Sequence, residues 1–412
     1  MRTLDLKTLK NAVAGEYAAI RRVTRMEALG EKIFPPTYEG GEYATEQRNV
    51  LNPEDKTVQT VETVLLDSVQ SQANRMELAL LRAYDSGRLK MPLLAVNFAG
   101  DGSNPILSEI GRLTALEAPH RMCDAIFRDA LYEGQPFRTV GPGERLNAAK
   151  PANATAVFEL CPTALIFGFW DSTGPRGGLG AKVQRALVSE IVGYRTTKDG
   201  KRPASRIDPL GIADNVDIYA KQGGGWTCKL DEAQTGADGQ PVKSKLTKTN
   251  HGNVTPSLIH EDKETKKWVL NHGGVTVAYA EQQTVFSLAA LRRLRFPLNG
   301  AIEPETDLAA RTVLAALGLA AVCFLDEDGY DLRSRCLLDG KPGAMAFVGR
   351  GEVQEFGLDA GASAGLLAEA VAEAKGLGLP WPEEPLVLTP FPALCDLIVK
   401  SRKLAMAKST GE

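Results

Sequence analysis

The spacing of apolar residues predicts a chain that mixes helices and strands. Alternation of apolar and charged residues, or a short continuous apolar run, indicates strands at 18–29, 93–98, 163–170, 187–194 and 275–286. Apolar residues three and four positions apart, or a composition rich in Ala and Leu, indicate helices at 57–83, 121–132, 307–319 and 363–375. Together these elements predict an α+β fold.

The predicted helix at 57–83 has a polar face. This face carries amides and one guanidinium: Gln70, Gln72, Asn74 and Arg75. Such groups can hydrogen bond to nucleotides, which makes Asn74 and Arg75 candidate RNA contacts. An ordinary solvated helix face explains the same residues equally well.

A long polar insertion occupies residues 221–271. It is rich in Gly, Lys, Thr, Asp and Gln and has few apolar residues, so it predicts a projecting loop or hairpin. The side chains in it that can contact RNA are Lys243, Lys245, Lys248, Asn250 and His251. A chain of 412 residues can form one elaborated domain or two modest ones, and we interpret 1–412 as one elaborated domain that carries this insertion.

Net charge restricts where nucleic acid can bind. The chain has 48 Lys and Arg against 51 Asp and Glu, a formal net charge of -3. A protein that binds nucleic acid through overall basicity would have an excess of cations. Any nucleic-acid site must therefore be a local cluster.

Cysteine and histidine spacing gives no sign of a metal site. The six cysteines are scattered without a CxxC pair, and the four histidines match neither HExxH nor another close ligand spacing. We therefore expect no metal and no other cofactor.

The distribution of apolar residues along the chain predicts a soluble protein. With 43% hydrophobic residues the chain can bury a sizeable core. The N-terminus has no signal-peptide core, and about 18 consecutive apolar residues occur nowhere. We expect a cytoplasmic protein that does not enter a membrane.

The segment 171–185, DSTGPRGGLGAKVQR, is the most informative part of the sequence. It follows a predicted buried strand and combines glycines with hydroxyls and cations. Glycine permits close approach of a phosphate chain, and Lys and Arg neutralise its charge. The candidate phosphate-binding residues are Ser172, Thr173, Gly174, Arg176, Gly177, Gly178, Lys182 and Arg185. A structural turn with incidental charges is the competing interpretation.

Enzyme motifs do not fit this segment. The P-loop pattern fails because Lys182 follows Ala181 and precedes Val183, and the GxGxxG pattern fails because Val183 stands at the third glycine position. Asp171 and Ser172 have no His nearby in sequence, although a triad partner could be remote. We assign no catalytic residue.

Three segments together resemble a known family: LLDSVQSQANRMELAL (65–80), LIFGFWDSTGPRGGLGAKVQRALVSEIVGY (165–194) and NHGNVTPS (250–257). They look like the RAMP-type backbone subunit of type I-G CRISPR Cascade complexes, formerly type I-U, in the wider Cas-seven family. The middle segment is the most specific. The similarity runs from the N-terminus through at least the third segment, and the C-terminal third matches only in general character.

This resemblance implies a ferredoxin-like palm sheet, similar to an RNA-recognition motif, with helical and hairpin insertions. It also implies copies stacked in a helical filament along the guide RNA (crRNA). The implied partners are the guide RNA, further copies of the chain, other Cascade subunits, target DNA through the guide, and a recruited helicase–nuclease. In the wider family a β-hairpin thumb folds over the guide, and 221–271 is the candidate for it. Because we find no RNP motif, phosphate contacts without base readout are expected.

Two alternatives stay open. Related backbone subunits of type III systems cut RNA with a loop aspartate, and Asp171 is the nearest candidate here, although one aspartate beside a glycine turn is more often a cap or turn residue. A protein-interaction scaffold that never touches nucleic acid is the other, supported by the near-neutral net charge. We favour a guide-RNA-binding subunit of antiviral defence and expect no enzymatic activity.

Overall fold

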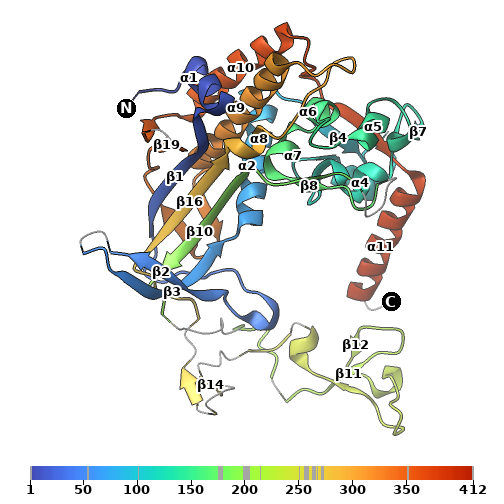
Figure 1. The fold of residues 1–412 in the computed structure, drawn as a ribbon. Coiled ribbons are helices and arrows are strands. Elements are labelled where there is room, and N and C mark those ends of the chain that lie inside the picture. The colour runs from blue at the N-terminus through green and yellow to red at the C-terminus, as the bar shows by residue number, and fades with distance from the viewer. Residues whose placement is uncertain are drawn as a thin grey trace. The chain divides into compact units, whose positions relative to one another are not determined.

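A computed structural model gives the fold of the 412-residue chain. It describes residues 2–52, 55–100, 102–174, 180–197, 205–213, 215–249, 251–254, 259–261, 266, 268–270, 273–349 and 352–410. By internal contacts the chain divides into two compact units (Figure 1). The first comprises Met1–Pro36, Ala44–Thr197 and Thr276–Phe391, and the second comprises Thr37–Tyr43, Lys198–Val275 and Pro392–Glu412.

The first unit is built on an antiparallel sheet with ferredoxin-like connectivity. Its central strands lie in the order β19-β1-β16-β10, and neighbouring strands are antiparallel. These strands are β1 (Tyr17–Ala28), β10 (Leu187–Tyr194), β16 (Tyr279–Ser287) and β19 (Met345–Gly349). Helix α2 (Val69–Asp85) comes between β1 and β10 in the chain, and α9 (Pro304–Asp328) comes between β16 and β19. This split β-α-β order confirms the predicted α+β fold with a palm like that of an RNA-recognition motif.

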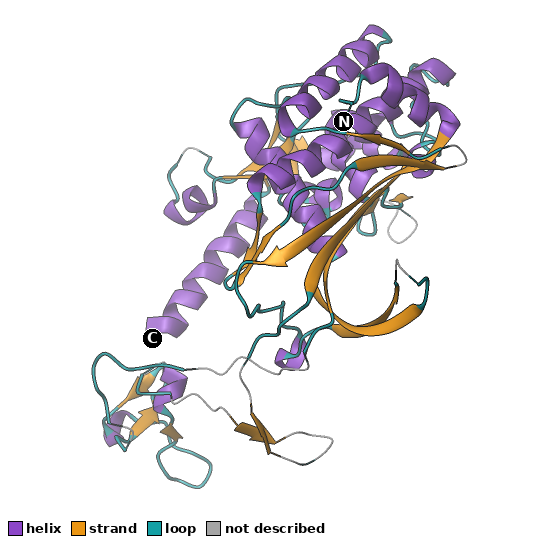
Figure 2. Cartoon of the chain, turned by 90° about the vertical axis from the view of Figure 1, so that its left-hand side faces the viewer, coloured by secondary structure: helices purple, strands orange, loops and turns teal. Residues whose placement is uncertain are grey.

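Further strands widen this sheet to nine (Figures 1 and 2). The hairpin of β2 (Thr45–Leu51) and β3 (Val58–Asp67) lies beside β10. In the hairpin of β17 (Tyr330–Arg333) and β18 (Cys336–Asp339), β18 pairs with the last two residues of β1, Glu27 and Ala28. Strand β20 (Gln354–Phe356) pairs with β19. The palm is thus extended by hairpins, as predicted.

Residues 86–186 add a second layer between α2 and β10. Its helices are α3 (Pro105–Ile110), α4 (Ala125–Arg128), α5 (Gly141–Arg145), α6 (Thr155–Leu160) and α7 (Pro162–Phe167). Its five-stranded sheet has the order β5-β4-β21-β6-β7. These strands are β4 (Leu94–Asn97), β5 (Arg112–Thr114), β6 (Ala130–Tyr132), β7 (Gln135–Pro136) and, from near the C-terminus, β21 (Leu386–Pro390). The last part of this segment contains a separate antiparallel hairpin of β8 (Phe169–Trp170) and β9 (Lys182–Val183).

Helix α9 is the core of the first unit. It is apolar on all sides, as expected of a helix surrounded by protein, and it packs against α2 and α10 (Ala360–Gly376). Smaller contacts come from α1 (Leu6–Asn11), α7 and α8 (Leu288–Leu291). Helix α9 is long and apolar enough to cross a membrane, but 94% of its most apolar 18-residue window is buried inside the protein. The core helix of a soluble protein can have the same length and composition.

The second unit contains short strands and one long helix. Strands β11 (Ile218–Ala220), β12 (Trp226–Thr227) and β13 (Lys243–Ser244) form one sheet, and β14 (Ile259–Glu261) pairs with β15 (Trp268–Leu270). Helix α11 (Pro392–Thr410) belongs to the same unit. The insertion 221–271 falls within this unit, and its role as a thumb stays a prediction.

The helix predicted at 57–83 is wrong in its first half. Residues Val58–Asp67 form β3, and the helix begins only at Val69. The first half is rich in Val and Thr, whose branching at Cβ favours a strand. Ser68 marks the boundary, because its side chain accepts a hydrogen bond from the Ser71 amide and caps α2.

The strand predicted at 163–170 is also wrong over most of its length. This apolar run is helix α7 up to Phe167, and only Phe169–Trp170 is a strand. A short buried run does not distinguish helix from strand by periodicity. Pro162 in the first turn favours the helix, and Gly168, with φ +79°, ends it.

The helix predicted at 121–132 is replaced by three shorter elements. They are a 3₁₀ turn (Arg121–Cys123), α4 and β6. Asp124 divides the first two, since its carboxylate accepts the Ile126 amide at 3.1 Å. The other predicted elements are confirmed in type, with boundaries shifted by a few residues or, for the helix at 307–319, extended at both ends to Pro304–Asp328.

Candidate nucleic-acid interface

The glycine-rich segment is the connection of the β8–β9 hairpin. Phe169 pairs with Val183 and Trp170 with Lys182, and the Asp171 amide donates to the Ala181 carbonyl at 2.9 Å. Three predicted phosphate-binding residues, Arg176, Gly177 and Gly178, lie outside the described residues. At the start of the connection Ser172 is half-buried and Thr173 is exposed.

Asp171 fixes one end of this connection through a buried ion pair. Its carboxylate accepts two hydrogen bonds from Arg138, at 2.7 and 3.4 Å, and the side chains are 10% and 7% exposed. Asn147 holds Arg138 from the other side. A Cβ at Gly174 would lie 2.6 Å from the Asp171 Cγ, so glycine there lets the chain turn over its own carboxylate.

A second buried ion pair fixes the other end of β8. Arg121 donates to both oxygens of Glu77, at 2.7 Å each, and to the Gly168 carbonyl at 3.0 Å. Burial raises the pKa of the Glu77 carboxyl, although Arg121 opposes the rise. Gly168 is needed here, since a Cβ would lie 2.9 Å from the Arg185 nitrogen. The hairpin is therefore held rigidly at both sides of β8.

Arg185 has a half-buried guanidinium without an anionic partner. Its Nε donates to the Phe167 carbonyl at 3.0 Å, and in the described part of the chain no carboxylate forms an ion pair with it. Burial lowers the pKa of Arg185, and the charge of Arg121 lowers it further, while Glu77 opposes the shift. A bound anion would relieve both effects.

Two further cations line a pocket at the foot of the hairpin. Lys182 and Arg293 share this pocket of about 340 Å³, whose other walls include apolar side chains. Arg293 donates to Gln184 Oε1 at 2.9 Å, and the Lys182 ammonium lies 5.4 Å from the centre of the exposed Trp170 ring. Among described residues neither cation has a carboxylate partner. We use the name hairpin cluster for Trp170, Lys182, Arg185 and Arg293.

Sequence reasoning found half of the hairpin cluster. Lys182 and Arg185 were predicted, whereas Trp170 and Arg293 were not. The apolar run at 163–170 predicts Trp170 at the end of a buried strand, but the residue is 51% exposed. Arg293 lies over 100 residues further along the chain, and only the run of cations at 292–295 (RRLR) could have drawn attention to it.

The two candidates on α2 lie in different surroundings. Asn74 is exposed. Arg75 uses its guanidinium inside the protein, where Nε donates to Asp67 at 3.0 Å and Nη2 to the Leu332 carbonyl at 2.6 Å. An RNA contact from Arg75 would therefore compete with two internal hydrogen bonds.

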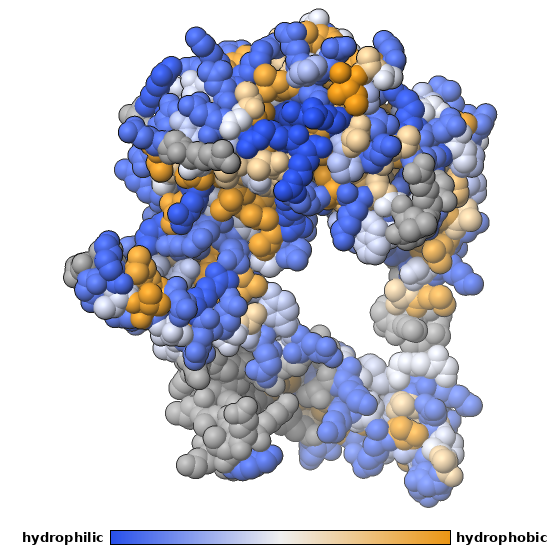
Figure 3. All heavy atoms as spheres, in the orientation of Figure 1, coloured by the Kyte–Doolittle hydropathy of each residue, from blue (hydrophilic) through white to orange (hydrophobic). Residues whose placement is uncertain are grey.

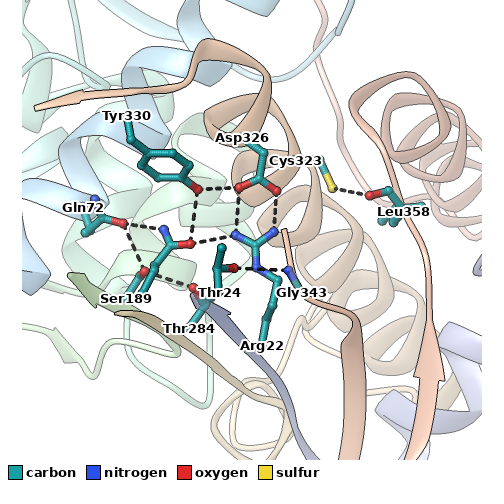
Figure 4. Close-up of polar contacts among 11 residues, drawn as sticks. Arg22, Thr24, Gln72, Ser189, Thr284, Cys323, Asp326, Tyr330, Gly343 and Leu358 are labelled. Carbon is teal, nitrogen blue, oxygen red and sulfur yellow. Dashed lines mark hydrogen bonds and ion pairs between the residues drawn. The ribbon is translucent and has the colours of Figure 1, made fainter. Parts of the chain in front are cut away.

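Gln72 belongs to a buried polar network instead of a solvated helix face (Figure 4). Its amide donates to Asp67 at 2.6 Å and accepts from Gln282 at 2.9 Å and from Ser189 at 3.1 Å. From Gln282 the network continues to Arg22, which is ion-paired with Asp326. Its members come from β1, β3, β10, β16, α2 and α9, so it joins the palm sheet to its two crossover helices.

The candidates in the insertion belong to the second unit. Lys243 pairs with Asp217 at 2.8 Å, while Lys245 and Lys248 are exposed. The His251 ring packs edge-on against Trp226 at 5.5 Å. Asn250 lies outside the described residues.

The motif at 250–257 has a structural use where it is described. The Gly252 amide donates to the buried Asp208 carboxylate at 2.8 Å, and Asn253 accepts the Asp208 amide at 2.8 Å. These bonds tie residues 251–254 to 205–210. The described part of the motif therefore anchors a loop of the second unit.

Aromatic rings on the open face of the palm are already stacked. Tyr194 and Tyr279 lie 4.9 Å apart and nearly parallel, and the Arg25 guanidinium covers the Tyr279 ring at 3.1 Å. Tyr194 is only 6% exposed. No ring face of this pair is open for the base stacking that RNA-recognition motifs use.

Comparison with known proteins points to CRISPR systems. Residues 22–198 match the family model described as CRISPR-associated protein GSU0053 (Cas_GSU0053). This range includes the second half of β1, all of α2, the β8–β9 hairpin and β10, and therefore three of the four members of the hairpin cluster. No curated protein matches the chain. The match supports a role in CRISPR defence.

Proposed function

We propose that this protein is a guide-RNA-binding backbone subunit of a type I CRISPR interference complex. The observation that carries the proposal is the hairpin cluster. Lys182 and Arg293 line one pocket at the hairpin, Arg185 follows β9 by two residues, and none of the three has a carboxylate partner among the described residues. Most other described arginines pair with carboxylates. Cations left in excess are what a phosphate chain requires.

The chemistry of the cluster suits phosphate recognition. A chain with net charge -3 needs a local excess of positive charge to bind RNA, and the cluster supplies it. Guanidinium and ammonium groups bind phosphate without reading the base. Base edges of the guide then stay free to pair with target DNA, as RNA-guided recognition requires.

The remaining elements of the proposal follow from the resemblance to type I-G backbone subunits. Copies of the chain would line up along the guide RNA as a helical filament in the cytoplasm. Other Cascade subunits would complete the complex, and a separate helicase–nuclease would cut the target DNA. The insertion 221–271 would supply the thumb.

On this proposal the protein has no enzymatic activity of its own. Asp171, the nearest candidate for a nuclease carboxylate, is buried and accepts two hydrogen bonds from Arg138. A carboxylate that binds catalytic metal needs an oxygen that the metal can reach, and burial against Arg138 opposes this. Magnesium-dependent cleavage by purified protein that is lost in Asp171→Ala would overturn this assignment.

The salt dependence of RNA binding tests the proposal. In Lys182→Ala and Arg293→Ala we expect weaker binding of labelled guide RNA for every guide sequence. We also expect the slope of log affinity against log salt to fall by about 0.7 for each lost contact, because fewer counterions are released. Fluorescence anisotropy over a salt series measures both quantities.

Lys7→Ala is the matched control. Lys7 is an exposed cation on α1, away from the hairpin in sequence, and its loss removes the same charge. Affinity and slope should stay at wild-type values. If Lys182→Ala and Arg293→Ala also kept both, the hairpin cluster would not be the RNA site. Protein purified without nuclease that carries no RNA and binds no guide would favour the scaffold alternative.

A further inference from the structure

Trp170 is displayed on the outer face of a short hairpin. Strand pairing places Phe169 opposite Val183 and Trp170 opposite Lys182, and successive pairs point to opposite faces. Phe169 and Val183 are each 8% exposed, so their face packs on the protein. Trp170 is 51% exposed, so the other face shows an indole beside an ammonium group.

The backbone on both sides of Trp170 is fixed by buried charges. Gly168, two residues before it, is held by Arg121, and Asp171, directly after it, is held by Arg138. The indole is therefore presented from a rigid position, which lowers the entropy lost on binding a ligand. A tryptophan that served only to fill the core would lie on the other face.

We propose that Trp170 is a stacking platform for an unpaired nucleobase, with Lys182 and Arg293 binding the phosphates that follow along the pocket they share. This inference rests on the proposed function and extends it to the class of ligand. A base can stack on the indole only when it is free of its own neighbours, so the ligand is single-stranded nucleic acid with one base turned out of the stack. Stacking of this kind tolerates any base.

Other aromatic groups in the described part of the first unit do not offer this surface. Tyr194 and Tyr279 stack on each other, and Trp381 is only 4% exposed. Trp170 combines exposure with a neighbouring cation, Lys182, which has no described carboxylate partner and which shares a pocket with a second such cation, Arg293. That combination separates a binding platform from a solitary exposed apolar side chain, which is common on protein surfaces.

Binding of a fluorescent oligouridylate to Trp170→Ala and Trp170→Phe tests the platform. We expect Trp170→Ala to weaken binding about tenfold, because a ring that stacks on the base is removed. The salt slope should stay unchanged, because the substitution removes no charge. Trp170→Phe, which keeps a flat ring, should recover most of the affinity. Leu337→Ala, which truncates another exposed apolar residue, should bind as wild type. Duplex RNA should compete poorly with the oligouridylate.

Photo-cross-linking gives a readout that does not depend on the variants. An oligonucleotide containing 5-iodouridine should cross-link to the peptide that carries Trp170. Wild-type affinity in Trp170→Ala, or equal loss in Trp170→Phe, or cross-links only elsewhere would overturn the platform. If Lys182→Ala and Arg293→Ala still lowered affinity and salt slope, the proposed function would stand without it. Unchanged binding in Trp170→Ala, Trp170→Phe, Lys182→Ala and Arg293→Ala would reject both the platform and the proposed function.

Discussion

At the scale of single residues, carboxylate partners separate structural arginines from available ones. Arg121 and Arg138 are buried, and each forms an ion pair with one carboxylate. Arg121 pairs with Glu77, and Arg138 pairs with Asp171. Arg185 lies near Arg121, and among the described residues its side chain donates to a carbonyl and pairs with no carboxylate. Buried ion pairs that position the hairpin thus lie close to a half-buried cation that can bind a ligand.

The Glu77–Arg121 pair should make stability depend on pH in Arg121→Ala. A carboxyl whose pKa is raised on folding binds more protons in the folded state, so stability falls as pH rises from its ordinary value of 4.5 toward the folded value. Removing Arg121 leaves a buried charge unpaired, which lowers the free energy of unfolding by about 3–5 kcal/mol at neutral pH. Below the ordinary pKa, Glu77 is protonated and the deficit should shrink.

Urea unfolding of wild type and Arg121→Ala at several pH values measures this deficit. The double variant Glu77→Gln, Arg121→Gln is the control, because it has no charge to leave unpaired and should show no such pH dependence. A deficit in Arg121→Ala that was the same at acid and neutral pH would contradict the assignment.

At the scale of elements, the close contact between α9 and β16 should make alanine destabilising at a helical glycine, where it usually stabilises. Gly318 lies within α9, and a Cβ there would lie 2.6 Å from Phe286 Cζ of the palm sheet. Gly365 lies within α10 with nothing within 4 Å of its Cβ position. The two glycines share their backbone conformation and differ in their surroundings.

Alanine at these two glycines should change stability in opposite directions. Gly365→Ala should raise the free energy of unfolding by about 0.5–1 kcal/mol, since alanine loses less conformational entropy in a helix. Gly318→Ala should lower it by about 1–3 kcal/mol, because the methyl group overpacks against Phe286. Thermal or urea unfolding decides the sign, and stabilisation by Gly318→Ala would mean that the α9–β16 contact is looser than described.

The palm was largely predictable from sequence because its strands carry a clear alternation. β1 and β16 each show buried and less buried residues at every second position. The run at 163–170 gave no such alternation, and its helix became apparent only from Pro162 and Gly168. At the site, glycines and neighbouring cations predicted Lys182 and Arg185. Arg293 could not be found, because folding alone brings it to the hairpin.

Two features decided by tertiary structure also escaped prediction. The sequence predicts Gln72 on a solvated helix face, but the residue is fully buried. Its hydrogen-bond partners lie up to 210 residues away in the chain, so no local pattern indicates them. Arg75 reads as a free cation, although Asp67 and Leu332 satisfy it. Polar side chains paired over such distances leave no local pattern.

At the scale of the whole molecule, the palm and the insertion differ in what stabilises them. The first unit has the buried helix α9 and a nine-stranded sheet, while the described strands of the second unit are two or three residues long. Short strands and polar composition bury little apolar surface to offset the entropy of ordering, about 1–2 kcal/mol per residue. A ligand or a neighbouring copy can supply the missing contacts.

Limited proteolysis of the free and guide-bound protein tests this coupling. We expect cleavage within 221–271 in free protein and protection of the same bonds when guide RNA is bound, because binding would order the insertion. The lysines at 243, 245 and 248 offer trypsin sites, and the exposed Lys7 in the first unit serves as an internal reference whose cleavage should not change. Protection should also be lost in Lys182→Ala if RNA binding at the hairpin cluster drives it. Equal cleavage of 221–271 in both states would rule out the thumb assignment, since a linker without RNA contacts gains nothing from the guide.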